Sequence, residues 1–148
     1  MSMESIALSR RLIEEVWNNR RLDVVSELIA PNHTNHDPNS PDFGKGPEAY
    51  KRLVSLYTTA FPDLHITIED TVSEDDKLVI SWNVSGTHKG DLRGTPPTNK
   101  KMSIEGITIS RHANGKILES RVSWDALGMM QQLGVVPALG QAKGATGR

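Results

Sequence analysis

The first third of the chain repeats its apolar residues at the spacing of helices. Residues 4–19 gather their apolar side chains, Trp17 among them, near one face, with arginine and glutamate opposite, which predicts an amphipathic helix. A second, shorter helix is predicted over residues 22–30. Pro31 ends it, because the residue before a proline is disfavoured in helical geometry.

A third helical stripe is the most regular in the chain. Between Tyr50 and Phe61 the apolar residues recur at i, i+3, i+4, i+7 and i+11. Pro47 stands where a first helical residue is expected, and Pro62 marks the end. The polar, turn-rich segment before this helix leaves room for a short extended piece near residues 33–36.

In the second half of the chain the apolar period changes to two, which is typical of half-buried strands. Two strands follow each other across the acidic turn 73–76, and two more are predicted over 100–112 and 116–124. Asn114-Gly115 separates the last two and suits a two-residue hairpin turn, in which both central residues take positive φ. A short helix is predicted after them, over residues 126–133.

Helices that precede a run of hairpin-linked strands favour the α+β class. We therefore predict three N-terminal helices packed on a strongly curved antiparallel sheet of four strands, a cone-shaped α+β barrel. A chain of 148 residues suits one domain. We assign residues 1–136 to that domain and expect the small, polar residues 137–148 to form a flexible C-terminal tail.

Charge and composition narrow the function. The net charge is −1 and the pI is about 6.5, without a basic stripe, so nucleic acid is not an expected partner. The absence of cysteine excludes a thiol nucleophile and disulfides. No apolar stretch has the length of a signal peptide or a membrane span, so we expect a cytoplasmic protein without a membrane partner.

Asp125, at the exit of the last predicted strand, is the first candidate for chemistry. A carboxyl group held in an apolar pocket can act as a general acid or base. The alternative is that Asp125 caps the helix predicted to begin at Ala126, since aspartate is a preferred capping residue. If the apolar side chains of the last strand face the helices, Asp125 faces away, unless a bulge near the strand end reverses the pattern. The sequence leaves both alternatives open.

Histidines supply further candidates. His36 lies in the polar run from His33 to Pro38, where it either lines a pocket or makes a loop hydrogen bond. We predict no metal site there, because a short cluster without partners elsewhere does not complete a coordination shell. We interpret Asp37-Pro38 as a turn. His88 follows the second strand and either points into a cavity mouth or stabilises a turn.

Aromatic and basic side chains have similar alternatives. Trp17 and Trp82 fall on apolar faces, which favours positions in the core, and either one also suits the wall of a site for a planar ligand. Arg121 projects from the last strand. It either orients an oxyanion or pairs with Glu119 or Glu105 across strands.

Several short motifs carry a resemblance to one known family. They are Asn35-His36-Asp37-Pro38, Ala60-Phe61-Pro62-Asp63, Trp82 with Gly86-Thr87-His88-Lys89-Gly90, Gly94-Thr95-Pro96-Pro97-Thr98, Asn114-Gly115-Lys116-Ile117 with Glu119, and Asp125-Ala126-Leu127-Gly128 with Gln132-Leu133-Gly134. Over residues 4–134 the chain resembles the SnoaL-like polyketide cyclases, within the nuclear-transport-factor-two-like superfamily of cone-shaped α+β folds.

The resemblance implies a cofactor-free enzyme that closes the last carbocycle of a polyketide by intramolecular aldol condensation. A pocket aspartate would exchange the proton on an activated carbon, and the ligand's conjugated system would spread the enolate charge. The family's strand-end aspartate matches Asp125, its binding-loop histidine matches His36, and its strand-end histidine matches His88. Ser120 and Arg121 stand where many relatives carry an aromatic residue and a histidine, which weakens the case for aromatic polyketides as substrates.

We therefore predict a cofactor-free acid/base enzyme acting on a small hydrophobic carbonyl compound, similar to polyketide (ester) cyclases. The predicted catalytic residues are Asp125, His36 and His88, and the predicted substrate-binding residues are Trp82, Arg121, Asn35, Trp17 and Tyr57. The alternatives are a non-catalytic ligand-binding or dimerisation module, and a cofactor-free monooxygenase or hydrolase.

The expected macromolecular partner is a second copy of the chain. Val79, Ile107 and Ile109 are predicted on the outer face of the sheet, where burial between two copies would remove them from water. We therefore expect a homodimer.

Overall fold

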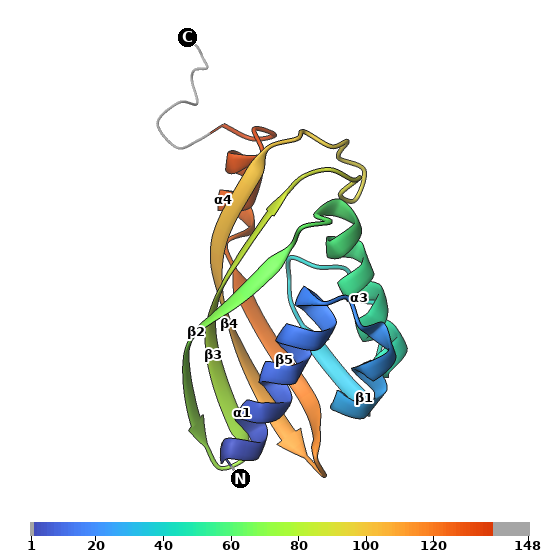
Figure 1. Cartoon of the computed structure of the whole chain (residues 1–148), viewed down its shortest axis with the longest axis vertical. Helices are drawn as coiled ribbons and strands as arrows, with labels where there is room; N and C mark the ends of the chain where they lie inside the picture. Colours follow the sequence, from blue (N-terminus) through green and yellow to red (C-terminus); the bar gives the residue numbers. More distant parts are fainter. Residues whose placement is uncertain (1, 138–148) are drawn as a thin grey trace.

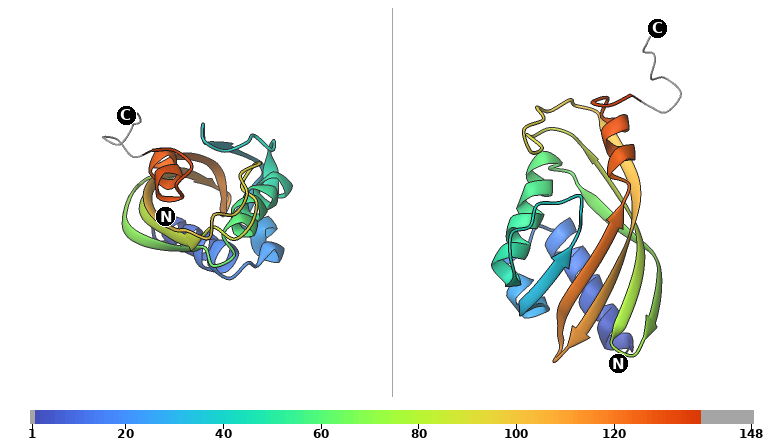
Figure 2. Two further views of the ribbon diagram at one scale, coloured as in Figure 1. Left: turned by 90° about the horizontal axis from the view of Figure 1, so that it is seen from above. Right: turned by 180° about the vertical axis from the view of Figure 1, so that it is seen from behind.

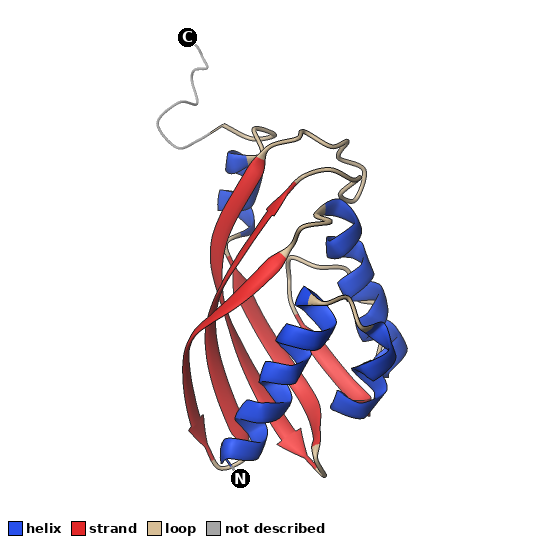
Figure 3. Ribbon diagram, in the orientation of Figure 1, coloured by secondary structure: helices blue, strands red, loops and turns tan. Residues whose placement is uncertain are grey.

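The computed structural model describes residues 2–137 and confirms the predicted α+β class. A strongly curved, open sheet wraps around helices that lie on its concave side (Figure 1). The view from above in Figure 2 and the colouring in Figure 3 separate the curved sheet from the helices. The predicted tail begins at residue 137, and its remaining residues, 138–148, lie outside the described residues.

The elements follow one another in the predicted order, with one addition. The helical segments are α1 (Ser2–Arg11), its π-helical continuation η1 (Leu12–Asn18), the short 3₁₀ turn η2 (Leu22–Val24), α2 (Val25–Leu28), α3 (Gly46–Ala60) and α4 (Ala126–Gln132). The strands are β1 (Ile29–His36), β2 (His65–Glu74), β3 (Lys77–Thr87), β4 (Lys101–Ala113) and β5 (Lys116–Trp124).

The addition is β1, and it corrects the prediction of four antiparallel strands. The second helix stops at Leu28, and Ile29 already has an extended backbone, with φ −104° and ψ 126°. The chain then pairs in parallel with β5, so the sheet has five strands in the order β1-β5-β4-β3-β2. Pro31 is compatible with this position because β1 is an edge strand, where a missing N–H is tolerated.

The hairpin-linked strands match the prediction closely. β5 begins and ends at the predicted residues, and Asn114 and Gly115 both have positive φ, 54° and 74°, as the two-residue turn requires. The pairing of β4 with β5 shifts register between Arg111 and His112, near the start of β5 rather than its end. The alternation of inward and outward side chains therefore continues unbroken to the exit of β5.

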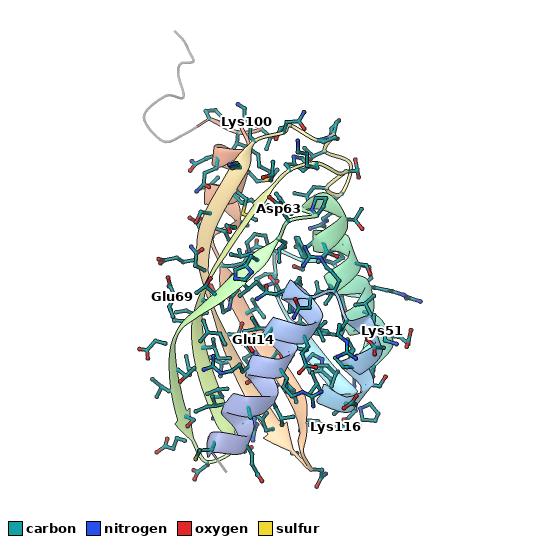
Figure 4. All side chains as sticks on the ribbon, viewed as in Figure 1. Glu14, Lys51, Asp63, Glu69, Lys100 and Lys116 are labelled. Atoms are coloured by element: carbon teal, nitrogen blue, oxygen red, sulfur yellow. The ribbon has the colours of Figure 1, made fainter. Side chains whose placement is uncertain are left out.

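The outer face of the sheet carries an exposed apolar row. Val79 is paired in register with Val72 on one side and Ile109 on the other, and the latter two are 64% and 41% exposed. Ile107 is also exposed. The exposed side chain of Glu69 on β2 points away from the helices as well (Figure 4). The homodimer stays a prediction. Within residues 2–137, no helix is long and apolar enough to cross a bilayer.

Replacing Ile109 by lysine tests the dimer. If this row is buried between two copies, the charge must be desolvated at the interface, and we expect the variant to be monomeric at micromolar concentration, where the parent chain is dimeric. Light scattering measures the mass. Met3→Lys adds the same charge at an exposed apolar position of α1 and should leave the mass unchanged. A monomeric parent chain would contradict the prediction.

Candidate active site

A deep pocket lies between the helices and the concave face of the sheet. It holds about 1000 Å³ of space, including solvent at its mouth. Its wall is mostly apolar, and all three tryptophans of the chain, Trp17, Trp82 and Trp124, line it. A pocket of this character suits a small hydrophobic molecule, with a few polar groups to orient it.

Asp37 supplies a carboxylate to this pocket. It follows β1 directly and lies two residues after Asn35, so both side chains reach the same side. Both oxygens accept from the indole Nε1 of Trp124, at 3.1 and 2.9 Å. Oδ1 also accepts from the backbone N–H of Asn39 at 2.9 Å, and Oδ2 from the hydroxyl of Ser40 at 2.7 Å.

These three donors hold the Asp37 carboxylate in one orientation. Each oxygen accepts two hydrogen bonds, one of them from the Trp124 N–H that the two oxygens share. Among the described residues that line the pocket, Asp37 alone carries a carboxyl group, and none is histidine, lysine or arginine. Residues 2–137 also contain no group of three or more histidine, aspartate or glutamate side chains that could hold a metal ion.

Tyr57 extends the hydrogen-bond network around the carboxylate. Its hydroxyl lies 2.7 Å from Ser40 Oγ. Since the one proton of Ser40 goes to Asp37, Tyr57 donates to Ser40. Burial, with a smaller effect of the Asp37 charge, raises the pKa of the Tyr57 phenol, so it remains a donor at neutral pH. The tyrosine ring also packs edge-on against Trp124, with ring centroids 5.8 Å apart.

Asp125 does not reach the pocket. It is exposed, and its Oδ1 accepts the backbone N–H of Gly128 at 2.8 Å, which caps α4. The prediction that this carboxylate faces an apolar hollow is wrong, and the helix-cap alternative is confirmed. The cause is the unbroken alternation along β5: Trp124 faces the pocket, so the next side chain faces away.

His36 and Arg121 lie on the opposite face of the sheet from the pocket. His36 Nε2 is 3.0 Å from Glu119 Oε2, and Arg121 Nη2 is 3.6 Å from the same oxygen, with the arginine side chain 61% exposed. Neither residue lines the pocket, so the expectation that His36 and Arg121 lie in its wall is wrong. In the parallel register, His36 pairs with Arg121 directly after the pair Asn35–Ser120, whose side chains face the pocket. Because successive strand residues face opposite sides, the side chains of His36 and Arg121 face outward.

His88 is fully buried beneath the loop that joins β3 to β4. The backbone N–H of Thr98 donates to its Nδ1 at 3.2 Å, which makes Nδ1 an acceptor and leaves the proton of the neutral ring on Nε2. The ring packs against Phe61, with centroids 5.5 Å apart. His88 does not line the pocket. The expectation that His88 points into a cavity mouth is therefore wrong, and the turn-stabilising alternative is confirmed.

The remaining predicted residues do lie in the pocket wall: Trp17, Trp82, Asn35 and Tyr57. Trp17 Nε1 donates to the Tyr50 hydroxyl at 2.8 Å, and Trp82 Nε1 donates to Thr108 Oγ1 at 2.9 Å. With their N–H groups satisfied, both indoles offer apolar ring surface to a ligand. That these residues bind one stays a prediction.

The sequence at Asp37-Pro38 predicts a turn and does not reveal that Asp37 supplies the carboxylate of the pocket. A signal was present, because Asn35 is a predicted binding residue and Asp37 follows it at the spacing that keeps two strand side chains on one face. What the sequence does not reveal is the partner Trp124, which lies 87 residues away in the chain.

A buried imidazole beside the pocket makes stability depend on pH. His33 is 2% exposed, and burial lowers its pKa to about 4 from 6.5. Between these values the unfolded chain binds a proton that the folded chain does not, so the free energy of unfolding falls as the pH drops from 6.5 toward 4. Burial also lowers the pKa of His112, which adds to the effect in the same direction.

The variant His33→Gln removes this titration. Each proton bound only by the unfolded chain costs about 1.4 kcal/mol of stability per pH unit. We therefore expect urea denaturation between pH 6.5 and 4.5 to show a shallower loss of stability in the variant than in the parent chain. Equal slopes would contradict the assignment to His33. The solvent-exposed His65→Gln is the matched control and should keep the parent slope.

Comparison with known proteins agrees with the fold. A family model described as SnoaL-like polyketide cyclase matches residues 7–133. Nogalonic acid methyl ester cyclase of Streptomyces nogalater is 32% identical over 119 residues, which cover 80% of this chain and 89% of the relative. Aklanonic acid methyl ester cyclase DauD of Streptomyces sp. (strain C5) is 32% identical over 136 residues, covering 87% and 81%.

Solved structures show the same architecture. A candidate polyketide cyclase from Acidithiobacillus ferrooxidans superposes with a TM-score of 0.80 at 29% identity, covering 89% of this chain and 95% of its own. TsrD from Streptomyces laurentii superposes with a TM-score of 0.81 at 22% identity, covering 90% and 97%, a likeness that concerns the fold alone.

Proposed function

Because the chain belongs to the SnoaL-like polyketide cyclase family, we propose that it closes a carbocycle in a polyketide-derived ester by intramolecular aldol chemistry, with Asp37 as acid and base. The observation that carries the proposal is the single carboxylate among the described residues of a mostly apolar pocket. The two relatives described above, both methyl ester cyclases, support the choice of substrate class.

The reaction balances with one carboxylate. Asp37 takes the proton from a carbon beside a carbonyl group, and the conjugated system of the ligand spreads the enolate charge. The carbanion attacks a second carbonyl carbon of the same molecule, so a carbon–carbon bond forms and an alkoxide results. The proton on Asp37 then returns to that alkoxide. No atom is gained or lost, and no electron leaves the ligand, so the proposed chemistry requires no cofactor.

The neighbours of Asp37 suit this exchange. Trp124 and Ser40 anchor the carboxylate from the side of the protein, and Tyr57 supports Ser40. A catalytic group that is held by its own hydrogen bonds meets the ligand in a fixed geometry, which removes an entropic cost from the reaction. Asn35 adds a side-chain amide on the same face, where it is placed to orient a ligand oxygen.

Incubation with aklanonic acid methyl ester tests the proposal. The expected product has the same mass and one more ring, detected by liquid chromatography with mass spectrometry. In D₂O the activated carbon should take up deuterium faster with the protein than without it, because the first step is proton abstraction. A recovered starting compound without deuterium would contradict the proposal.

The same measurement separates the alternatives. A monooxygenase adds the mass of oxygen, and a hydrolase adds water or releases methanol from the ester. A non-catalytic binding module, which the same fold also supports, binds the compound and returns it unchanged. The ring-closing proposal is favoured over the binding module because a purely apolar site has no need for a carboxylate anchored by three donors.

A further inference from the structure

The pocket has polar groups at both ends. Asp37 lies near α4, where the indole of Trp124 holds it. The other end, close to the turn between β4 and β5, is lined by the hydroxyl groups of Ser9, Ser110 and Ser120, and we call it the hairpin end. Figure 1 shows α4 and the β4–β5 turn at opposite ends of the sheet. The aldol chemistry proposed for Asp37 makes no use of the hairpin end.

Ser110 is the central residue of the hairpin end. It is 3% exposed, lies in register between Leu78 of β3 and Ser120 of β5, and lines the pocket. Its Oγ makes no hydrogen bond to any of the residues from 2 to 137. Because a buried hydroxyl group is costly without a partner, we expect its partner to come from whatever fills the pocket.

The two neighbouring hydroxyl groups are backed by imidazoles. Ser120 Oγ lies 2.9 Å from His33 Nε2, and Ser9 Oγ lies 3.3 Å from His112 Nε2. Burial lowers the pKa of both histidines, so both rings are neutral at pH 7. The hairpin end therefore combines hydroxyl donors and acceptors without a charge, which favours a neutral oxygen function over a carboxylate or an ammonium group.

We propose that the hairpin end is a subsite for a neutral oxygen group, a phenol or a ketone, at the end of the ligand remote from the reacting carbon. The proposal rests on the proposed function, because it takes Asp37 as the position of the reacting end. Ser120 and Trp124 are four residues apart on β5, which separates the two ends by about 13 Å along the strand. The ligand is therefore elongated and apolar in the middle, with oxygen at both ends.

Two probes that differ by one hydroxyl group test the subsite. They are 2,6-dihydroxyanthraquinone, with oxygen at both extremities, and 2-hydroxyanthraquinone, with one extremity bare. Binding is followed by quenching of tryptophan fluorescence, because all three tryptophans line the pocket. We expect the parent chain to bind the dihydroxy compound more tightly, and Ser110→Ala to reduce its affinity roughly two- to tenfold with little effect on the monohydroxy compound.

The matched control is Ser123→Ala, which removes a hydroxyl group from an exposed position of the same sheet region and should leave both affinities unchanged. Ser110→Ala should also be at least as stable to urea as the parent chain, because its hydroxyl has no partner among the described residues. Three results would each overturn the subsite: equal losses for both probes, a preference retained in Ser110→Ala, or no binding of either probe.

The test is independent of catalysis. Neither probe has to react, so the same titrations in Asp37→Asn should keep the preference for the dihydroxy compound. If the aldol chemistry is wrong but the subsite is right, the parent chain leaves the ester unchanged and still prefers that probe. If the subsite alone is wrong, ring closure proceeds and the probe preference is insensitive to Ser110.

Discussion

Replacing Asp37 by asparagine is expected to lower the rate constant of ring closure by about 10²- to 10⁴-fold, the usual contribution of a well-placed acid or base. The amide has the same shape as the carboxylate, and its oxygen can still accept from Trp124, so the pocket should keep its form and KM should change little. What the amide lacks is the ability to take and return a proton. Steady-state kinetics of the variant measures the loss.

Asp125→Asn is the matched control. Asparagine is as good a helix cap as aspartate, so α4 should stay in place and activity should be unchanged. The two variants make the same chemical change at two carboxylates, one in the pocket and one outside it. If Asp125→Asn loses the activity and Asp37→Asn keeps it, the assignment made from the structure is reversed.

Deuterium uptake separates the two halves of the reaction. If Asp37 abstracts the proton, Asp37→Asn should lose both deuterium exchange and ring closure. A variant that still exchanges deuterium but forms no ring would show that another group removes the proton and that Asp37 acts on the alkoxide alone. Ligand binding, measured by tryptophan quenching, is the control. If the variant still binds the ligand, its loss of deuterium exchange or of ring closure does not come from a disrupted pocket.

The elements that the sequence predicts best are those with local causes. The boundaries of β5 and the turn at Asn114-Gly115 follow from alternation and from the need for positive φ, both of which are visible within a few residues. β1 is different, because its segment contains Pro31 and little alternation. Its partner β5 lies more than 80 residues away, and only that pairing makes the segment a strand.

The residues of the candidate site show the same difference between local and long-range causes. Alternation along the last strand favours an outward Asp125, and the resemblance to the family favours an inward one; the structure agrees with the alternation. Asn35 and Asp37 line the pocket while His36 between them does not, because one residue on a strand reverses the face. The sequence identifies the right segment, but the face depends on how β1 docks on β5.

The loop that carries His88 shows a further limit of the sequence. A histidine near the end of a strand is compatible with a pocket or with a turn, and spacing alone does not separate the two. The structure decides through contacts made on both sides of the ring: Thr98 donates to its Nδ1, and Phe61 packs on its face. The ring therefore ties the loop to the end of α3 and not to a ligand.

Phe61→Ala should be the most destabilising of the substitutions considered, lowering the free energy of unfolding by about 3–5 kcal/mol. The side chain is completely buried and belongs to the cluster that forms the α4 end of the pocket. It also supports His88, whose loop is tied to α3 where the backbone N–H groups of Lys89 and Gly90 donate to Ala60 O, at 3.0 and 3.1 Å. Urea denaturation measures the loss.

Phe43→Ala is the matched control for Phe61→Ala, since it removes the same ring from the only other phenylalanine of the chain. Phe43 is only partly buried beside the core, so a smaller loss is expected. In Phe61→Ala the amide hydrogens of Lys89 and Gly90 should also exchange faster, because the cavity removes the surface on which His88 rests. Equal losses of unfolding free energy in the two variants would contradict this prediction. They would mean that the contact of Phe61 with His88 contributes no stability beyond that of burying a phenyl ring, and that backbone hydrogen bonds alone hold the loop.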